Sequence, residues 1–380
     1  MISGNSFVLC FAGFSAVKMK IATIIGARPQ FIKASPVSRA LANCAEIEEV
    51  LVHTGQHSDD SMSDVFFREM EIPAPRYHLG IAGLAHGAMT GRMLEAIEQI
   101  LVTEKPDWAL VYGDTNSTLA GALAACKMNI PVAHVEAGLR SFNRRMPEEI
   151  NRICADHISA ALFAPTRTAV RNLANEGVAR DKVLLTGDVM YDATIAFSRL
   201  AEDRSRILAD LDLNPGAYVL ATIHRAENTD NPARLTAILQ GLGQASHQFP
   251  VVLPLHPRTR NAVAMLGHSF PKTVTVANPV GYLDMLMLEK NARLIATDSG
   301  GVQKEAYFHR VPCVTLRDET EWVELVEAGA NRLAPPHDSR TIADAIESAL
   351  AAPRNVFGQS DLYGNGNAAE KIAAWFCRAH

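Results

Sequence analysis

Short apolar runs alternate with helix-length amphipathic segments along most of the chain. Apolar runs bounded by polar or turn residues are typical of strands that are buried on both faces of a parallel sheet. In the first half such runs occupy residues 21–26, 49–54, 108–113, 132–136, 161–165 and 182–187. In the second half they occupy residues 218–223, 251–254, 273–276, 293–297 and 313–316. This alternation predicts an α/β fold in which helices cover parallel sheets.

A helical and charged segment, residues 188–216, separates the two series of strands and ends in an Asn-Pro-Gly turn. We therefore expect two domains, residues 19–188 and residues 189–366, and a last helix near 367–380 that packs back on the first domain. Open α/β sheets bind ligands at the carboxyl ends of their strands. Two facing domains of this kind would place a ligand-binding cleft between them.

The composition indicates two hydrophobic cores and a protein that works in a reducing compartment. At 380 residues and 48% hydrophobic content, the chain can bury two cores of ordinary domain size. Its formal net charge of −5 argues against a nucleic-acid-binding protein, which would carry a basic patch. The cysteines form no CxxC pair and have no regular spacing, so we expect neither a zinc cluster nor a disulfide framework. A cytoplasmic location fits this cysteine usage best.

The N-terminal segment contains an apolar run, residues 7–17, of roughly the length of a signal-peptide core. No Lys or Arg precedes this run, and Met19 stands directly before the first strand. We therefore expect that residues 1–18 are an extended or misassigned start and that Met19 is the natural first residue. No later run reaches the ~18 uninterrupted apolar residues that a membrane span requires, so no membrane association is expected.

The first candidate site follows the first strand, at Gly26 and Arg28, with Lys33 one turn into the next helix. Glycine permits a tight turn, the proline after Arg28 suits the first turn of a helix, and a helix N-terminus attracts anions. The segment matches neither a dinucleotide-binding GxGxxG loop nor a Walker A loop. Phosphate binding is one interpretation, and an arginine that pairs with a surface carboxylate is the other.

Acidic residues follow two strands of the first half. Asp114 and Glu136 each come directly after an apolar strand, and Glu148 and Glu149 lie shortly beyond. Carboxylates gathered in one cleft shift each other's pKa values, which suits them to proton transfer. The structural alternatives are a helix cap at Asp114 and salt bridges from the glutamates to Arg140 and Arg152. A metal site is not favoured, because no compact DxD or HExxH arrangement is present.

A serine and two glycines, Ser299, Gly300 and Gly301, follow an apolar strand of the second half and start a helix. The free backbone N–H groups of such a helix N-terminus can bind a diphosphate. Glu305 lies about one turn further on, where it could accept hydrogen bonds from ribose hydroxyls. Arg317, after the next strand, could neutralise phosphate charge. A plain glycine-rich turn is the alternative interpretation.

Two histidines, His224 and His256, lie at strand ends of the second half, each with an arginine within two residues. An imidazole titrates near neutral pH, so either could contact phosphate or act on a leaving group. A lone histidine is more often structural, but two in comparable positions favour a functional interpretation. Gln56 and His57, after a strand of the first half, are a weaker pair of candidates and could equally close a loop.

The ordered blocks at these strand ends resemble the non-hydrolysing UDP-N-acetylglucosamine 2-epimerases. The matching blocks are GARPQFIK, HTGQH, VYGDTNSTLAGALAA, HVEAGLRS, PEEINR, TIHRAEN, PLHPRTR, TDSGGVQKEA and TLRDETEW. They run from about residue 20 to residue 330, and a Tyr-Gly-x-Gly segment at 363–366 extends the resemblance to the C-terminal tail. The resemblance implies a glycosyltransferase-B-like fold of two facing Rossmann-like domains, with the active site in the interdomain cleft.

The resemblance also implies a reaction, the interconversion of UDP-N-acetylglucosamine and UDP-N-acetylmannosamine by anti elimination of UDP and re-addition. The partners would be a UDP-sugar, UDP and a second copy of the chain in a homodimer, and no redox cofactor or metal would be needed. The product would supply bacterial surface polysaccharide. By resemblance, the proton chemistry belongs to Asp114, Glu136 and Glu148. Also by resemblance, the residues that hold or act on the nucleotide are Arg28, Lys33, Arg152, His224, Ser299, Gly300, Glu305 and Arg317.

Two runs, Arg-Pro-Gln-Phe at residues 28–31 and Glu-Trp-Val-Glu at residues 321–324, differ from the commonest family pattern. These variants also resemble the branch that acts on UDP-2,3-diacetamido-2,3-dideoxyglucuronate. Binding the C5 carboxylate of that sugar would require an additional cation, such as Arg144 or Arg145. This uronate epimerase is the alternative function. A glycosyltransferase of the same fold is a further alternative, although it would need an acceptor site and would not need three clustered carboxylates.

Overall fold

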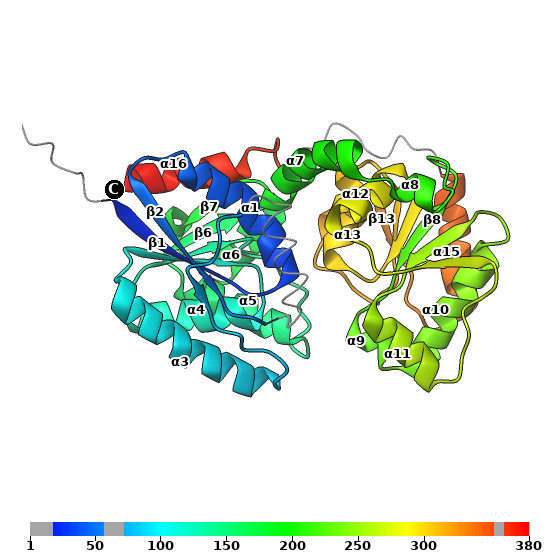
Figure 1. Ribbon diagram of the computed structural model, residues 1–380, viewed down its shortest axis with the longest axis horizontal. Coiled ribbons are helices and arrows are strands. Elements are labelled where there is room, and N and C mark those ends of the chain that lie inside the picture. Colours follow the sequence, from blue (N-terminus) through cyan, green and yellow to red (C-terminus); the bar gives the residue numbers. More distant parts are fainter. Residues whose placement is uncertain (1–17, 57–71, 353–360, 380) are drawn as a thin grey trace, which may run out of the picture.

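The computed structural model describes residues 18–56, 72–352 and 361–379 of the chain. Two sheets lie next to each other along the longest axis of the molecule, and helices cover both faces of each (Figure 1). The first sheet has seven strands in the order β3-β2-β1-β4-β5-β6-β7, and the second has six in the order β10-β9-β8-β11-β12-β13. The predicted α/β fold with parallel sheets is confirmed, because all neighbouring strands pair in parallel.

The strands are β1 (Met19–Ile25), β2 (Ile47–His53), β3 (Tyr77–His78), β4 (Trp108–Tyr112), β5 (Val132–Val135), β6 (Ala161–Ala164), β7 (Val183–Leu185), β8 (Val219–Thr222), β9 (Val251–Pro254), β10 (Val274–Ala277), β11 (Leu294–Thr297), β12 (Cys313–Thr315) and β13 (Asn331–Leu333). The helices are α1 (Arg28–Ala42), α3 (His86–Glu104), α4 (Asn116–Lys127), α5 (Pro147–Ile158), α6 (Arg167–Asn175), the 3-10 helix η1 (Arg180–Lys182), α7 (Val189–Arg204), α8 (Ile207–Asp210), α9 (Ala226–Thr229), α10 (Pro232–Ala245), α11 (Pro257–Met265), α12 (Tyr282–Asn291), α13 (Gly300–Phe308), α14 (Val323–Glu327), α15 (Ser339–Ala351) and α16 (Ala368–Ala379).

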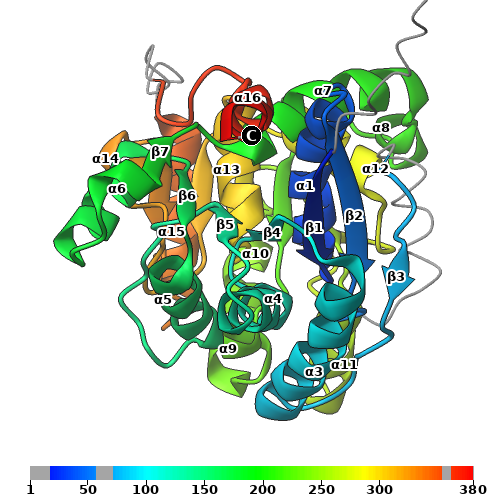
Figure 2. The same cartoon turned by 90° about the vertical axis from the view of Figure 1, so that its left-hand side faces the viewer.

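Strand β1 shows why these strands read as continuous apolar runs. Its side chains alternate between the two faces of the sheet, and both faces are covered. Ile21 and Ile25 join the core beneath α1, α7 and α16, whereas Ala22 and Ile24 join the core beneath α3, α4 and α5. Figure 2 shows these two helix layers on opposite faces of the first sheet.

The second sheet is enclosed in the same way. One face packs on α10 and α15, where Ile238 and Ile342 belong to a single buried cluster. The other face packs on α12 and α13, where Leu288 and Val302 are buried with strand residues such as Ile295. We call the first sheet with its helices the first half of the molecule and the second sheet with its helices the second half.

All the strands expected from the apolar runs are present, and two further strands were not expected. β3 is only two residues long and partly exposed, and β13 contains polar residues, so neither forms an apolar run. Several predicted strands end one residue early, and the residues left over, such as Gly113 and Glu136, lie in the loops at the carboxyl edge of the first sheet. These loops carry the candidate site.

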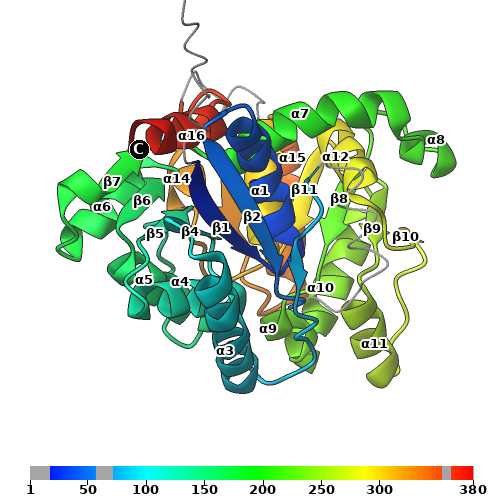
Figure 3. The ribbon, with the colours of Figure 1, turned by 60° about the vertical axis from the view of Figure 1, so that its left-hand side comes forward.

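Helix α7 joins the two halves. It packs against α1 and α16 on one side and against α12 and α13 on the other. Phe197 of α7 and Tyr282 of α12 are in edge contact, with ring centroids 5.9 Å apart. Helix α16 lies beside α1 (Figure 3), and its Trp375 packs edge-on against Trp108 at 5.1 Å. The expected domain boundary at residue 188 therefore coincides with the start of a helix that contacts both halves.

Some expectations concern residues whose structure is not described. The interpretation of residues 1–17 as an extended start lies outside the described residues, and so does the assignment of His57. Five cysteines of the described part, Cys44, Cys126, Cys154, Cys313 and Cys377, are free thiols. Among the described residues, none of the helices has the length and apolar character needed to cross a membrane.

Candidate active site

Gly26, at the end of β1, allows three loops of the first half to meet. A Cβ atom at this position would lie 1.8 Å from Oγ1 of Thr54 and 2.5 Å from Oγ of Ser117. Those two hydroxyl groups are hydrogen-bonded to each other at 2.7 Å. Only glycine fits against this pair, and Arg28 then begins α1 at the carboxyl edge of the sheet.

Gln30 ties this loop to the end of β4, and the sequence motifs did not reveal that role. Its buried Oε1 accepts hydrogen bonds from the backbone N–H groups of Gly26 at 2.8 Å and Ala27 at 3.1 Å. Its Nε2 donates to the backbone carbonyl of Tyr112 at 2.9 Å. A glutamate could make the first two bonds but not the third, because it lacks the donor. The signal in the sequence is an amide side chain in the first turn of a helix, where it can reach back to free N–H groups.

Glu136 forms ion pairs with lysines from both halves of the molecule. It follows β5 with a left-handed backbone, at φ +70°. Lys33 of α1 contacts its Oε2, and Lys304 of α13 donates to its Oε1 at 2.7 Å. Lys304 also donates to Asp188, the N-cap residue of α7, at 2.6 Å. The four buried side chains form one network of two carboxylates and two ammonium groups.

The lysines decide the charge of Glu136. Burial alone would raise the pKa of this carboxyl, but the positive charges of Lys304 and Lys33 outweigh burial and lower the pKa to about 2. Burial likewise lowers the pKa of Lys304, yet Asp188 and Glu136 raise it more, so the net shift is upward. Glu136 is therefore ionised at neutral pH. The expected mutual perturbation of the carboxylates is wrong for Glu136, because cations govern its pKa.

Asp114 follows β4 and pairs with a buried arginine. Its carboxylate contacts Arg152 of α5, and its backbone carbonyl accepts a hydrogen bond from Nδ2 of Asn151 at 2.9 Å. Burial lowers the pKa of Arg152, but the negative charges around it, led by Asp114, raise it by more, so the net shift is upward. The cap of α4 is Thr115, so the alternative interpretation of Asp114 as a helix cap is wrong.

Two adjacent glutamates at the start of α5 have different surroundings. Glu149 is 1% exposed, and its carboxylate accepts hydrogen bonds from the backbone N–H of Ser141 at 2.9 Å, from Oγ of Ser141 at 3.0 Å and from the N–H of Phe142 at 2.9 Å. Glu148 is partly buried, and within the described ranges no hydrogen bond or ion pair engages it. Glu149 therefore shapes the preceding loop, whereas the carboxylate of Glu148 stays available.

The arginines expected to pair with these glutamates behave differently. Arg152 donates to Glu149 at 3.1 Å, so the salt-bridge alternative is correct for that glutamate. Arg140 pairs instead with Asp156 at 2.7 Å and Glu176 at 2.6 Å, and the expected pairing with a site glutamate is wrong for Arg140. Asp156 also binds His134 at 2.7 Å, which anchors the end of β5 behind the site.

Asp298 organises the second half of the site, although the sequence motif that contains it indicated no role for this residue. The carboxylate is fully buried and accepts hydrogen bonds from the backbone N–H groups of His224 at 3.0 Å and Arg225 at 3.1 Å. Nδ2 of Asn228 donates to it at 3.1 Å and to the carbonyl of Leu316 at 3.0 Å. Asp298 therefore fixes the loop after β8. An aspartate directly before Ser-Gly-Gly at a strand end was the available signal.

His224 and His256 lie together, with ring centroids 5.5 Å apart. Burial lowers the pKa of both imidazoles, and the positive charge of Arg28 from the first half acts in the same direction. Asp298 opposes these effects but does not reverse them. His256 also caps α11, because its Nδ1 accepts a hydrogen bond from the backbone N–H of Arg258 at 3.1 Å. Both imidazoles are therefore neutral at pH 7, and the charge of Arg28 from the first half acts on each of them.

The N-terminus of α13 presents a serine and two glycines. Ser299 is the N-cap, and its Oγ accepts from the N–H of Val302 at 3.5 Å. A Cβ atom on Gly300 would lie 2.9 Å from Oε1 of Glu321, and one on Gly301 would lie 3.2 Å from Cε of Met190. A side chain at either glycine would therefore have to displace the end of a neighbouring side chain.

Arg317, which the sequence offered as a cation for phosphate, is paired with two glutamates in the structure. It is fully buried, and it donates to Glu227 at 3.1 Å and to Glu321 at 2.8 Å. Burial alone would raise the pKa of Glu321, but Arg317, followed by Arg225 and Arg152, lowers it strongly. Two of its nitrogens are therefore already engaged by carboxylates, with which a phosphate would have to compete.

Glu305 is 4% exposed and accepts a hydrogen bond from the hydroxyl of Tyr282 at 3.0 Å. Burial raises its pKa to about 7, although Tyr282, Lys304 and Arg28 act to lower it. Gln56, the remaining candidate of the first half, accepts hydrogen bonds from the backbone N–H of Ser117 at 3.1 Å and from its Oγ at 2.9 Å. Among the described residues, no group of His, Cys, Asp or Glu side chains is arranged to hold a metal ion.

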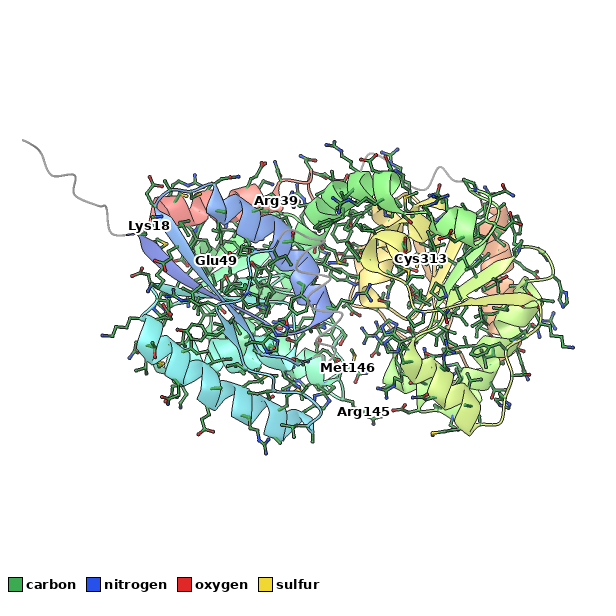
Figure 4. All side chains as sticks on the ribbon, viewed as in Figure 1. Lys18, Arg39, Glu49, Arg145, Met146 and Cys313 are labelled. Carbon is green, nitrogen blue, oxygen red and sulfur yellow. The ribbon has the colours of Figure 1, made fainter. Side chains whose placement is uncertain are left out.

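Loops of the two halves also touch directly. Asn143 of the loop before α5 donates to Glu319 at 2.5 Å, and Nη2 of Arg317 lies 3.9 Å from the sulfur of Met146. In Figure 4 Arg145 and Met146 lie on the edge of the first half that faces the second. The candidate residues of both halves thus meet where the carboxyl ends of the two sheets face each other.

Comparisons with known proteins agree with this arrangement. The family model described as UDP-N-acetylglucosamine 2-epimerase matches residues 39–376. A UDP-2,3-diacetamido-2,3-dideoxy-D-glucuronate 2-epimerase of Pseudomonas aeruginosa is 52% identical over 363 residues, which cover 95% of this chain and 100% of that protein.

Solved structures match over a similar length. The crystal structure of Methanocaldococcus jannaschii UDP-GlcNAc 2-epimerase in complex with UDP-GlcNAc and UDP has a TM-score of 0.89 at 44% identity, covering 95% of this chain and 100% of that one. Another structure of the same archaeal enzyme, with the same coverage and 43% identity, has a TM-score of 0.76. The expected glycosyltransferase-B-like fold is confirmed, and the chain belongs to the UDP-N-acetylglucosamine 2-epimerase family of isomerases.

Proposed function

We propose that this enzyme inverts C2 of UDP-2,3-diacetamido-2,3-dideoxyglucuronate. The observation that carries this choice is the 52% identity with the Pseudomonas enzyme named for that sugar, against 44% with the archaeal enzyme named for UDP-GlcNAc. The sequence motifs predict UDP-N-acetylglucosamine first and the uronate as the alternative, so the comparisons favour the alternative. UDP-N-acetylglucosamine is the second candidate, because the archaeal enzyme also aligns with 95% of the chain.

The loop before α5 could recognise the carboxylate that distinguishes the uronate. Arg144 and Arg145 are exposed on this loop. Arg145 lies at the edge of the first half that faces the second (Figure 4). Glu149 holds one side of the loop, and Asn143 reaches Glu319 of the second half. A guanidinium held at this place would bind a carboxylate by charge-assisted hydrogen bonds.

The reaction is an anti elimination followed by a re-addition. A carboxylate base takes the proton from C2, the electron pair forms a C1–C2 double bond, and the C1–O bond breaks with its electrons leaving on UDP. Protonation of C2 from the opposite face, with return of the UDP oxygen to C1, gives the epimer. Asp114 and Glu148 suit the proton transfers, because Asp114 is 30% exposed and Glu148 has no described partner to release.

Glu136 is suited to a different part of the reaction. Its pKa of about 2 makes it a weak proton acceptor. A carboxylate that stays ionised in a buried site stabilises positive charge that develops at C1 as UDP departs. We therefore assign Glu136 an electrostatic role beside the two carboxylates that transfer protons.

The diphosphate would lie between the halves. The N-terminus of α13, with Ser299, Gly300 and Gly301, offers N–H groups to one side of it, and Arg28 offers a cation from the other. His224 and His256, which lie near the positive charge of Arg28, could donate hydrogen bonds to phosphate oxygens. Arg317 instead holds Glu227 and Glu321 in place, because it is fully buried between them.

The remaining expectations belong to the same proposal. Residues 19–188 and 189–366 would be domains that move relative to each other around α7, and two copies would form a homodimer in the cytoplasm that serves surface-polysaccharide synthesis. Light scattering would test the dimer, which should have twice the 41.2 kDa mass of the chain.

The substrate is tested by supplying each UDP-sugar to the purified enzyme and following the C2 epimer by NMR. We expect kcat/KM to be higher for the uronate by about tenfold or more, the size of one charge-assisted hydrogen bond. Replacing Arg144 and Arg145 together by Ala should remove this preference and leave turnover of UDP-GlcNAc unchanged. Arg171→Ala, at an exposed arginine of α6, is the matched control. A higher kcat/KM for UDP-GlcNAc in the unaltered enzyme would reverse the assignment.

A further inference from the structure

Lys304 is a buried cation that the proposed function does not yet use. It lies in α13 of the second half, one residue before Glu305, and is 1% exposed. Taking an ammonium group out of water is strongly unfavourable unless carboxylates compensate its charge. The ammonium group of Lys304 therefore depends on the carboxylates that it contacts, and those contacts indicate its role.

The contacts of Lys304 connect three parts of the fold. Its Nζ donates to Glu136 after β5 at 2.7 Å and to Asp188 at the start of α7 at 2.6 Å. The same ammonium lies 4.2 Å from the ring centre of Trp322, in the loop before α14. Lys304 is thus fixed from the second half, from the connecting helix and from the first half at once.

Lys33 cannot take over this role, because it comes from the same half as Glu136. Lys33 contacts Oε2 and Lys304 contacts Oε1, so each carboxylate oxygen has its own ammonium partner. Removing Lys304 would leave Oε1 of Glu136 and the carboxylate of Asp188 without that partner. The network would then hold two buried carboxylates and one ammonium group.

We propose that Lys304 is a positioning residue that completes the active site from the opposite half of the molecule, by fixing Glu136 as an ionised carboxylate when α13 is seated against the first half. This inference rests on the proposed function, in which Glu136 acts as a charged group. Glu136 would then have both of its ammonium partners only when the two halves are seated against each other. An isolated first half would lack the second ammonium and would not be competent.

Loss of Lys304 should change the pH dependence of turnover in a definite direction. The charged groups facing Glu136 are Lys33 and Lys304, and those facing Lys304 are Glu136, Asp188, Glu305 and Glu324. Burial raises the pKa of Glu136 and the lysines lower it, so loss of Lys304 raises it. Turnover that requires ionised Glu136 will then fail at a higher pH than in the unaltered enzyme.

The test is the pH dependence of kcat in full-length Lys304→Met and Lys304→Arg, measured with the better UDP-sugar of the substrate assay. In Lys304→Met the buried Glu136 loses one of its two lysines and also faces the unpaired carboxylate of Asp188, so its pKa should rise from about 2 past those of the carboxylates that transfer protons. We therefore expect Glu136 to set the acidic limb of kcat in this variant and the limb to move up by about one pH unit or more. Lys304→Arg keeps the charge and should leave the limb in place, even if kcat falls. The matched control is Lys290→Met, which removes an exposed lysine of α12 that pairs with Glu202.

The outcomes separate this inference from the proposed function. An acidic limb of Lys304→Met that coincides with that of the unaltered enzyme overturns the role of Lys304, whatever the fall in kcat. If Lys304→Met does not fold, Lys304→Arg decides the question, because a displaced limb in that variant contradicts the proposal and a limb in place supports it. Turnover that survives Glu136→Gln would instead contradict the proposed function itself.

Discussion

Glu149→Gln is expected to destabilise the enzyme far more than the same change at its neighbour Glu148. Glu149 is 1% exposed and accepts from two backbone N–H groups, one hydroxyl and Arg152. Oε1 faces an N–H donor, and Oε2 faces an N–H, a hydroxyl and a guanidinium. In glutamine one of these two oxygens is replaced by an NH2 group, which is a donor. Whichever oxygen is replaced, the NH2 group will face at least one other donor.

The size of the effect follows from these contacts. An unsatisfied buried donor is unfavourable by about 1–3 kcal/mol, and loss of the charge beside Arg152 weakens the bonds that remain. We therefore expect Glu149→Gln to lower the free energy of unfolding by about 2–4 kcal/mol. The loop should loosen as well, because Phe142 has a left-handed φ of +59° and its N–H is held by Glu149.

Urea unfolding followed by circular dichroism measures this difference, with activity recorded on the same samples. Glu148→Gln should unfold within about 0.5 kcal/mol of the unaltered enzyme, as surface substitutions usually do, yet lower kcat by ~10²-fold or more. Glu149→Gln should instead act mainly on stability and lower the urea midpoint of unfolding. Equal stabilities of the two variants would refute the division of roles between these glutamates.

Three further predictions concern the second half and its approach to the first. Asp298→Ala should lower the free energy of unfolding by about 3 kcal/mol and weaken UDP binding in calorimetry, because the donors of His224, Arg225 and Asn228 lose their acceptor. Glu305 has a pKa of about 7, above its ordinary 4.5, so the folded form keeps a proton that the unfolded form releases between these values. Its contribution to stability should therefore fall as pH rises through this window, and Glu305→Gln should flatten the pH dependence of the urea midpoint. UDP should reduce the radius of gyration in small-angle scattering, and Arg28→Ala should blunt the change, because a ligand gripped from both halves favours their approach.

Much of the fold could be predicted from the sequence because parallel strands are buried on both faces and form continuous apolar runs. Ile21 to Ile25 illustrate this, since both sets of alternating side chains are in a core. β3 and β13 could not be predicted in this way. Strands of two and three residues with polar or exposed positions have no periodicity to detect.

The location of the site was also predictable, because the motifs lie at the carboxyl ends of strands, where the topology brings them together. The pairing of charges was not. Nothing in the spacing of Glu136 and Lys304, 168 residues apart, indicates that they touch. The burial of Arg317 and the hydrogen bonds that converge on Asp298 likewise depend on tertiary packing. A pattern of residue types does not encode that packing.

The elimination mechanism is tested most directly by turnover in deuterated water with UDP-2,3-diacetamido-2,3-dideoxyglucuronate as substrate. Elimination and re-addition take the original hydrogen from C2 and return one that has exchanged with solvent. We expect mass spectrometry and NMR of the product to show the C2 epimer with deuterium at C2. An epimer that retains all of its original hydrogen at C2, or no epimer at all from either UDP-sugar, would contradict this mechanism.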